Sequence, residues 1–518
     1  MLACLESKIL NPKSAILLLC LMAFALRLGP AFDNRFHPDE ALFSSWALKI
    51  AGGENILLSG VPVDKPPLLI YTTAISFFFM GQTEIAARLP NLAASVISVA
   101  LIYGLAVGQL GTGSRLTILP SLLLAFSPFA ILFAPTAFLD PTMVMFGLAS
   151  LVAASRGRAG WAGILLGLSF ATKVQGLFFA PLILVYGATG QLVNRGLVDR
   201  GSWIRDQRSE IRDQPPRLFV SLSLVRFLAA FLTIALIVLA WDRLRGGLPF
   251  WEQQAINYGG IRVIYPSEVG PRLNGWLALL PYFFGPLLGL IGLIGLPILV
   301  WFDLTREART RAAWIDLTLI AWLFALFGLH WLLAFPVWDR YFLVLVPIAA
   351  LLVSRVISHL VIPKVPHVFG GMSSCHRVIL LFCLIVVALL PFSLVAAGSG
   401  YPIGGDHGGY DGIDQVAGYL RTLPSGAVVY DHWLGWELAY YLGEGHVYVA
   451  YFDTPAALAD DLRAFGHSRD RYVVFPANES PDKAIEAIGQ AGYVMSPIFW
   501  TQNRFNQTAF TIFKIQAR

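Results

Sequence analysis

Two adjacent carboxylates, Asp39 and Glu40, lie in the segment Arg35–Ala41 (RFHPDEA), shortly after the first apolar run of the chain. Carboxylates at a membrane surface are costly to desolvate, and such a pair can serve as a general base or as metal ligands. The same residues also suit the start of a helix, with Pro38 in the first turn and both acids near the positive end of the helix dipole. On these residues alone the two interpretations are equally open.

Basic residues follow at several apolar boundaries. Lys65 (in DKPPL) could pair with an anionic head group, or it could extend its ammonium to the membrane surface as many flanking lysines do. Lys173 ends an apolar run, where a lysine is costly unless it faces a cavity or the interface. Arg27 and Arg88 lie in or beside apolar runs, where an arginine usually faces the protein interior and pairs with a carboxylate. We interpret both as scaffold or phosphate contacts.

Further polar and aromatic residues border later apolar runs. Asp140 (in LDPT) could orient a ligand or hold a loop helix, or it could only cap the helix that Pro141 begins. Arg340 stands in the short motif WDRY. The loop 241–275 is rich in aromatic residues, which usually form an interfacial belt and could also serve as a sugar or acceptor platform.

Composition places these residues in a membrane protein. Of the 518 residues, 56% are hydrophobic and only 13% are charged, with a mean hydropathy of +0.66. This excludes one large soluble globule, disorder and collagen. The net charge of +5 makes nucleic-acid binding a poor explanation, and the four cysteines show no spacing typical of a metal site or a disulfide framework.

Runs of apolar residues predict about eleven membrane-spanning helices. They cover 14–26, 91–110, 117–136, 141–155, 159–174, 176–190, 218–240, 276–301, 313–333, 341–358 and 378–396. The stretch 66–80 is also apolar but short for a span, so we interpret it as a helix lying in the interface. A second interfacial helix is expected around 40–52.

Counting spans with 66–80 outside the membrane puts the Arg-rich loops on one side, around Arg115, Arg156, Arg306 and Arg355 and over 191–217. Arginine-rich loops favour the cytoplasm. The first outer loop (31–90), Asp140, Lys173, the loop 241–275, Arg340 and everything beyond about 397 are then predicted on the opposite face. We therefore expect residues 1–396 to form a membrane module and 397–518 to form an extracytoplasmic domain.

The composition changes at a Gly-rich linker after 397. Segments resembling strands (AVVY, HVYVA, YVVFP and YVMSPIF) alternate with expected helices at 433–442, 455–465 and 481–491, which predicts a small α/β domain. The segment Asp431–Glu437 (DHWLGWE) falls at a strand-to-helix junction, where binding residues often occur, although a cap with buried aromatics explains it equally well. No G-x-G-x-x-G turn suggests a nucleotide site.

Taken in order, HPDEA, DKPPL, AARLPN, LDPT and ATK resemble the N-terminal module of the polyprenyl-phosphate-dependent GT-C glycosyltransferases. Within that superfamily the chain is most similar to the protein O-mannosyltransferase and lipid A aminoarabinose transferase branch. The resemblance covers residues 14–190 well and 191–396 only in general architecture. It implies an inverting, multi-pass membrane glycosyltransferase whose first outer loop, with its interfacial helices, forms the floor of an active site on the extracytoplasmic side of the plasma membrane.

The resemblance also implies roles for single residues. The family's acidic pair falls on Asp39, the expected base, and Glu40, which would assist it or bind acceptor or metal; Asp140 matches a second acidic position. The phosphate of the donor would be bound by Lys65, Lys173 and Arg340, with Arg88 as a further contact. The superfamily contains metal-using and metal-independent branches, so a divalent metal cofactor stays open.

The expected partners are a polyprenyl-phosphate-linked sugar, membrane lipids and an acceptor that is a protein, a lipid or a glycan. A transporter or flippase of a lipid-linked intermediate is the alternative, because cations near the outer surface would also hold a phosphate. A transporter, however, should carry ionisable residues near the middle of the bilayer and broken helices in paired positions. A non-catalytic scaffold would leave the set of Asp39, Glu40, Lys65 and Lys173 unexplained.

Overall fold

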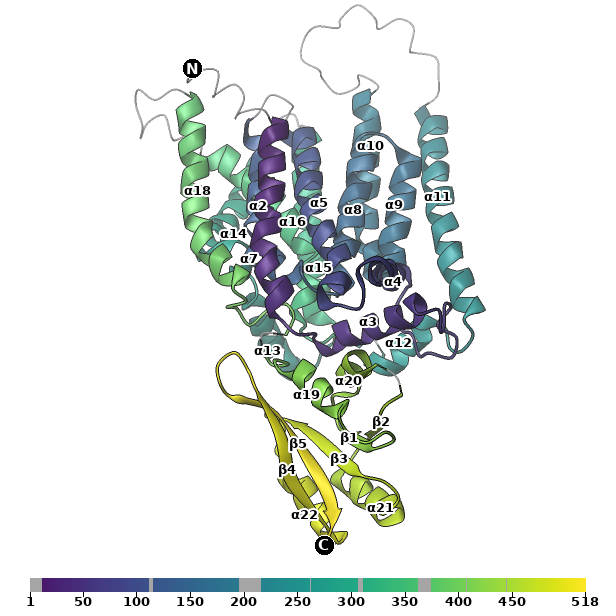
Figure 1. The fold of residues 1–518 in the computed structure, drawn as a ribbon. Coiled ribbons are helices and arrows are strands. Elements are labelled where there is room, and N and C mark those ends of the chain that lie inside the picture. The colour runs from purple at the N-terminus through teal and green to yellow at the C-terminus, as the bar shows by residue number, and fades with distance from the viewer. Residues whose placement is uncertain are drawn as a thin grey trace, which may run out of the picture.

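The computed structural model describes residues 12–110, 115–194, 216–260, 262–305, 311–361, 374–406, 408–443 and 445–518. A bundle of upright helices forms one body, and a small sheet domain lies beyond one end of it (Figure 1). Helix α3 (Pro38–Ala51) lies across the bundle at that end, between the two bodies (Figure 1). We call this the α3 end of the bundle.

The bundle contains the predicted spans as helical segments. They are α2 (Pro12–Asp33), α5 (Glu84–Leu110), η1 (Arg115–Ile118), α6 (Leu119–Ala125), α7 (Pro128–Phe133), α8 (Asp140–Ser155), α9 (Ala159–Thr172), η2 (Val174–Phe179), α10 (Ala180–Asn194), α11 (Pro216–Leu244), α14 (Pro281–Thr305), α15 (Arg311–Leu332), α16 (Leu345–Val356) with η4 (Ile357–Val361), and α18 (Ser374–Ala397). Among the described helices, six are long and apolar enough to cross a membrane: α2, α5, α11, α14, α15 and α18. The other predicted spans coincide with shorter apolar helices.

Several shorter helices are interrupted by identifiable residues. The predicted span 117–136 is divided between α6 and α7, because Ser127 caps α7 through a bond from the Ala130 amide at 3.2 Å and Pro128 begins it. Lys173 has an extended backbone (φ −156°, ψ 136°), which ends α9 before η2 begins. This break places the Lys173 side chain at the α3 end of the bundle.

The first loop contains two helices, as expected. Helix α3 begins at Pro38, and α4 (Leu68–Met80) has 13 residues, fewer than the about 20 that a span needs. The two helices share a buried cluster that includes Phe43, Trp46, Leu69 and Phe77, whereas Phe78 and Phe79 at the end of α4 are exposed. An apolar, exposed helix end of this kind suits the membrane interface.

Two short helices follow α11 at the α3 end: α12 (Phe250–Tyr258) and α13 (Pro266–Leu277). A 3-10 turn, η3 (Asp339–Phe342), then precedes α16. The backbone of Val263 forms an isolated antiparallel bridge with Leu333. These connections bring the residues around Tyr258 and Arg340 to the same end of the bundle as α3.

The C-terminal domain is a five-stranded sheet in the order β2-β1-β3-β5-β4. Strand β1 is parallel to β2 and β3, whereas β5 is antiparallel to β3 and β4. Its elements are α19 (Ile413–Leu420), β1 (Val428–Asp431), α20 (Gly435–Leu442), β2 (Tyr448–Tyr451), α21 (Pro455–Phe465), β3 (Arg471–Pro476), α22 (Asp482–Gln490), β4 (Tyr493–Gln502) and β5 (Thr508–Ala517). The sequence pattern predicts all of these elements except α19 and β5.

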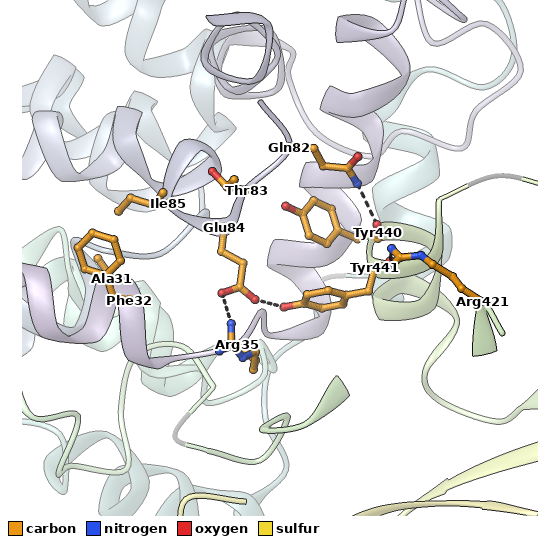
Figure 2. A pocket seen from close by; sticks show the side chains of 10 residues that line it. All are labelled: Ala31, Phe32, Arg35, Gln82, Thr83, Glu84, Ile85, Arg421, Tyr440 and Tyr441. Atoms are coloured by element: carbon orange, nitrogen blue, oxygen red, sulfur yellow. Dashed lines mark hydrogen bonds and ion pairs between the residues drawn. The ribbon is translucent and has the colours of Figure 1, made fainter. Parts of the chain in front are cut away.

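The C-terminal domain is attached to the first loop beside α3. Figure 2 shows the Glu84 carboxylate between two partners: it accepts a hydrogen bond from Arg35 Nη1 at 2.8 Å and another from the Tyr441 hydroxyl. The Phe36 amide donates to the same hydroxyl at 3.0 Å. Arg35, Glu84 and Tyr441 border a pocket of about 470 Å³ between α20 and the start of α5 (Figure 2).

Helices α2 and α18 approach closely at the α3 end, where a Cβ on Gly29 would meet the carbonyl oxygen of Ala397. We therefore expect Gly29→Ala to lower the free energy of unfolding by about 1–3 kcal/mol, as overpacking does. In α10, where nothing lies within 4 Å of a Cβ on Gly187, Gly187→Ala is the matched control and should not lower stability, since Ala favours a helix over Gly by about 1 kcal/mol. Equal melting temperatures of the two variants in detergent would contradict this packing.

Candidate functional site

Four of the residues predicted to do chemistry meet in one narrow pocket at the α3 end of the bundle. Lys65, Asp140, Lys173 and Arg340 line it. The other lining residues are Phe43, Phe138, Leu139, Gln175, Gln254, Tyr258 and Tyr341. The free volume is about 20 Å³, room for about one water molecule.

Asp39 joins this pocket through Arg340. The carboxylate of Asp39 accepts a hydrogen bond from Arg340 Nη1, and both side chains are largely buried, 14% and 10% exposed. Arg340 also lies over the rings of Phe138 and Trp338, at 4.9 Å and 4.7 Å from their centres. The guanidinium is therefore held in place by an anion and by two aromatic faces.

Asp39 is ionised at neutral pH despite its burial. Burial disfavours the carboxylate, but the charges of Arg340, His37 and Lys65 and the hydrogen bond from Arg340 outweigh it. The pKa of the Asp39 carboxyl therefore lies below its ordinary value. The helix adds to this, because Asp39 stands in the first turn of α3 near the positive end of its dipole.

Lys65 is paired within the first loop. Its Nζ lies 2.6 Å from Asp64 Oδ2 and donates to the Tyr258 hydroxyl at 3.2 Å. The Asn257 amide donates to the same Asp64 oxygen at 3.2 Å. Burial lowers the pKa of Lys65, an effect that Asp64 opposes without cancelling it.

Lys173 and Asp140 form a second buried pair. Lys173 Nζ lies 2.7 Å from Asp140 Oδ1 and 4.8 Å from the centre of the Tyr341 ring. Asp140 begins α8, so the break after α9 and the start of α8 jointly supply this pair. A buried lysine beside an apolar helix end thus faces a carboxylate, as its cost of burial requires.

Glu40 and Arg88 are not brought to this pocket. Glu40 is fully buried; its Oε1 accepts from Arg88 Nε at 3.2 Å and from the Ala137 amide at 2.7 Å, and its Oε2 accepts from the His37 amide at 3.1 Å. The Nη1 and Nη2 atoms of Arg88 donate hydrogen bonds to the backbone carbonyls of Ala31, Asn34 and Arg35. For Arg88 the geometry matches the scaffold interpretation, and Glu40 belongs to the same buried network.

The three pocket cations stand beside three carboxylates: Asp39, Asp64 and Asp140. Such a cluster can exchange partners when an anion enters, because each cation already holds an oxygen acceptor. Among the described residues, no group of three or more His, Cys, Asp or Glu could hold a metal ion.

Sequence reasoning missed several lining residues. Tyr258 lay in the aromatic loop 241–275 without being singled out, and Tyr341 directly follows Arg340. Gln175 and Gln254 border the pocket without any sequence signal that separates them from other polar residues. Only the tertiary arrangement identifies these four.

The chain resembles known proteins in part of its sequence and in its fold. Residues 64–204 match the family model described as dolichyl-phosphate-mannose-protein mannosyltransferase. ArnT from Cupriavidus metallidurans bound to undecaprenyl phosphate has a TM-score of 0.63 and 15% identity, over 97% of this chain and 98% of that one. The archaeal oligosaccharyltransferase AglB from Archaeoglobus fulgidus, in complex with an inhibitory peptide and a dolichol-phosphate, has a TM-score of 0.52 and 13% identity, over 96% and 74%. No curated protein sequence matches.

At these identities the solved structures establish the fold, which is that of the GT-C glycosyltransferases. The family match adds a segment that contains Lys65, Arg88, Asp140 and Lys173. The resemblance inferred from the sequence is thereby confirmed.

The Glu40 and Arg88 pair generates a stability prediction. Glu40→Gln removes the charge that compensates a buried guanidinium, so we expect the free energy of unfolding to fall by about 3 kcal/mol. Glu54→Gln, on an exposed residue of the same loop, is the control and should have no effect. Thermal unfolding in detergent measures both, and an unchanged melting temperature for Glu40→Gln would rule out this pair as the anchor of the loop.

Proposed function

We propose that the chain is a membrane glycosyltransferase of the GT-C type that transfers a sugar from a polyprenyl- or dolichyl-phosphate donor to an acceptor hydroxyl, with inversion, at the non-cytoplasmic face. The observation that carries this proposal is the convergence of Lys65, Lys173 and Arg340 on one pocket, with Asp39 directly bonded to Arg340. A phosphate leaving group needs cations, and an attacking hydroxyl needs a base.

The reaction assigns one role to each side. Asp39 accepts the proton of the acceptor hydroxyl while the oxygen of that hydroxyl attacks the anomeric carbon of the donor sugar. The bond between that carbon and the phosphate oxygen breaks, and its electron pair leaves with the polyprenyl phosphate. Attack from the face opposite to the phosphate inverts the configuration at the anomeric carbon.

The cations serve the leaving group. Lys65, Lys173 and Arg340 would hold the phosphate and stabilise the additional charge that develops as the bond breaks. Asp64 and Asp140 keep the two lysines aimed at the pocket, at 2.6 Å and 2.7 Å. When Arg340 binds the phosphate, its hydrogen bond to Asp39 weakens. A carboxylate oxygen of Asp39 then becomes available to the acceptor hydroxyl.

The distribution of charge supports an extracytoplasmic site. Arg156 and Arg158 follow α8, whose other end carries Asp140, so they lie at the end of the bundle opposite to the pocket. Arg-rich loops favour the cytoplasm. Most of the predicted cytoplasmic loop 191–217 lies outside the described residues. This charge placement supports the proposal that the pocket and the C-terminal domain lie outside the cytoplasm, and we propose the plasma membrane as the location.

Asp39→Asn tests the base directly. Without a proton acceptor, sugar transfer from a radiolabelled polyprenyl-phosphate donor should fall about 100-fold or more. Asp33→Asn, on an exposed residue at the end of α2, should transfer sugar at the wild-type rate. Undiminished turnover of a well-folded Asp39→Asn variant would exclude Asp39 as the base.

The pair of Asp39 and Arg340 also predicts a pH dependence. Activity requires ionised Asp39, and its lowered pKa keeps the acidic limb of kcat/KM at low pH. In Arg340→Gln, burial is no longer offset by the guanidinium, so the pKa of Asp39 rises and the limb moves to higher pH. Profiles between about pH 4 and about pH 8 measure this. Arg262→Gln, which changes an exposed arginine, should leave the limb in place, and an unmoved limb in Arg340→Gln would contradict the coupling.

A further inference from the structure

A third pocket, of about 500 Å³, lies in the C-terminal domain at the carboxyl ends of parallel strands. Its lining comes from the residues that follow β1 and β3, together with the linker before α19. They are Gly409, Tyr410, His432, Trp433, Leu434, Pro476, Asn478 and Glu479. The volume suits a ligand of several rings.

The topology explains why a pocket forms there. In the order β2-β1-β3, the chain passes from β1 to β2 on one side and then crosses back over β1 to reach β3 on the other side. Helix α20 contributes Leu438 to one apolar cluster, which also contains Leu434. Helices α21 and α22 contribute Leu458 and Ile488 to a different cluster. The two crossovers therefore lie on opposite faces and part between β1 and β3, which is where open α/β sheets bind ligands.

The chemistry of the lining fits a neutral sugar. Glu479 Oε1 lies 2.7 Å from His432 Nδ1, and its Oε2 has no hydrogen-bond partner among the described residues. Asn478 adds an amide, and Trp433 presents an indole that is 68% exposed. A carboxylate accepts hydrogen bonds from sugar hydroxyls, and an amide both accepts them and donates them. An indole face packs on the apolar face of a sugar ring. None of the described lining residues is Lys or Arg, so the pocket does not suit a phosphate.

The pocket adjoins the proposed base. Tyr410 lines it, and the Tyr410 ring is centred 6.5 Å from the ring of His37. His37 in turn caps α3, its Nδ1 accepting from the Asp39 amide at 3.2 Å. A bound molecule would thus lie next to the residue that caps the helix of Asp39.

We propose that this pocket binds the acceptor and that the acceptor is a saccharide, whose terminal hydroxyl reaches Asp39 past Tyr410. The proposal rests on the proposed function, because it names the acceptor of that transfer. Asp431 supports the pocket by accepting the Leu434 amide at 3.0 Å, which turns the chain after β1 and leaves Trp433 outward.

The test measures binding without catalysis. Neutral tetrasaccharides of glucose, mannose, galactose or N-acetylglucosamine are titrated against the full-length protein in nanodiscs, with saturation-transfer NMR as the readout. We expect at least one to bind and Trp433→Ala to weaken it about tenfold. Trp500→Ala, on a 62% exposed tryptophan of β4 outside the pocket, should bind as the wild type does.

Two outcomes would overturn the inference. One is that no tetrasaccharide binds, or that Trp433→Ala binds equally well. The other is that a Ser/Thr-rich peptide binds in the same titration, that no saccharide does, and that Trp433→Ala weakens the binding of the peptide. In either case sugar transfer from the lipid-linked donor to another acceptor would leave the proposed function standing. Saccharide binding by a protein that transfers no sugar would refute the proposed function and the acceptor role with it, and would leave the pocket as a saccharide-binding site only.

Discussion

Arg88 is fully buried, and its bonds hold the first loop against the bundle. The guanidinium donates to Glu40 and to three backbone carbonyls, those of Ala31, Asn34 and Arg35. A buried charge costs several kcal/mol unless it is paired and hydrogen-bonded, so this arginine imposes the path of the chain between α2 and α3. The position at which α3 begins, and therefore the position of Asp39, depends on it.

The start of α3 then gives two neighbouring carboxylates different environments. Successive residues of a helix point about 100° apart, so Glu40 can face the interior while Asp39 faces Arg340. Glu40 completes the capping box with His37 and receives Arg88, whereas Asp39 meets Arg340 from a distant part of the chain. Glu40 is thereby structural, whereas Asp39 is available for chemistry. The sequence alone does not distinguish them, because it shows only two neighbouring acids.

Much of this architecture could be predicted from the sequence. Apolar runs located the spans, and the shortness of 66–80 predicted the helix now seen as α4. Counting spans placed Lys65, Asp140, Lys173 and Arg340 at one end of the bundle, where they meet. The pairing of Arg88 with Glu40, far apart in sequence, follows only from the packing of α5 against the first loop. Strand β5 was missed although Phe510, Ile512 and Ile515 are buried along it, and α19 is a short helix behind a Gly-rich linker.

The central claim is that the three cations beside Asp39 hold the phosphate of the donor lipid. A structure of this protein with polyprenyl phosphate bound tests it most directly. We expect the phosphate within hydrogen-bond distance of at least two of Lys65, Lys173 and Arg340, with an Asp39 oxygen released toward the C-terminal pocket. A phosphate held elsewhere, for example by Arg35 and Arg421 in the pocket of Figure 2, would contradict it.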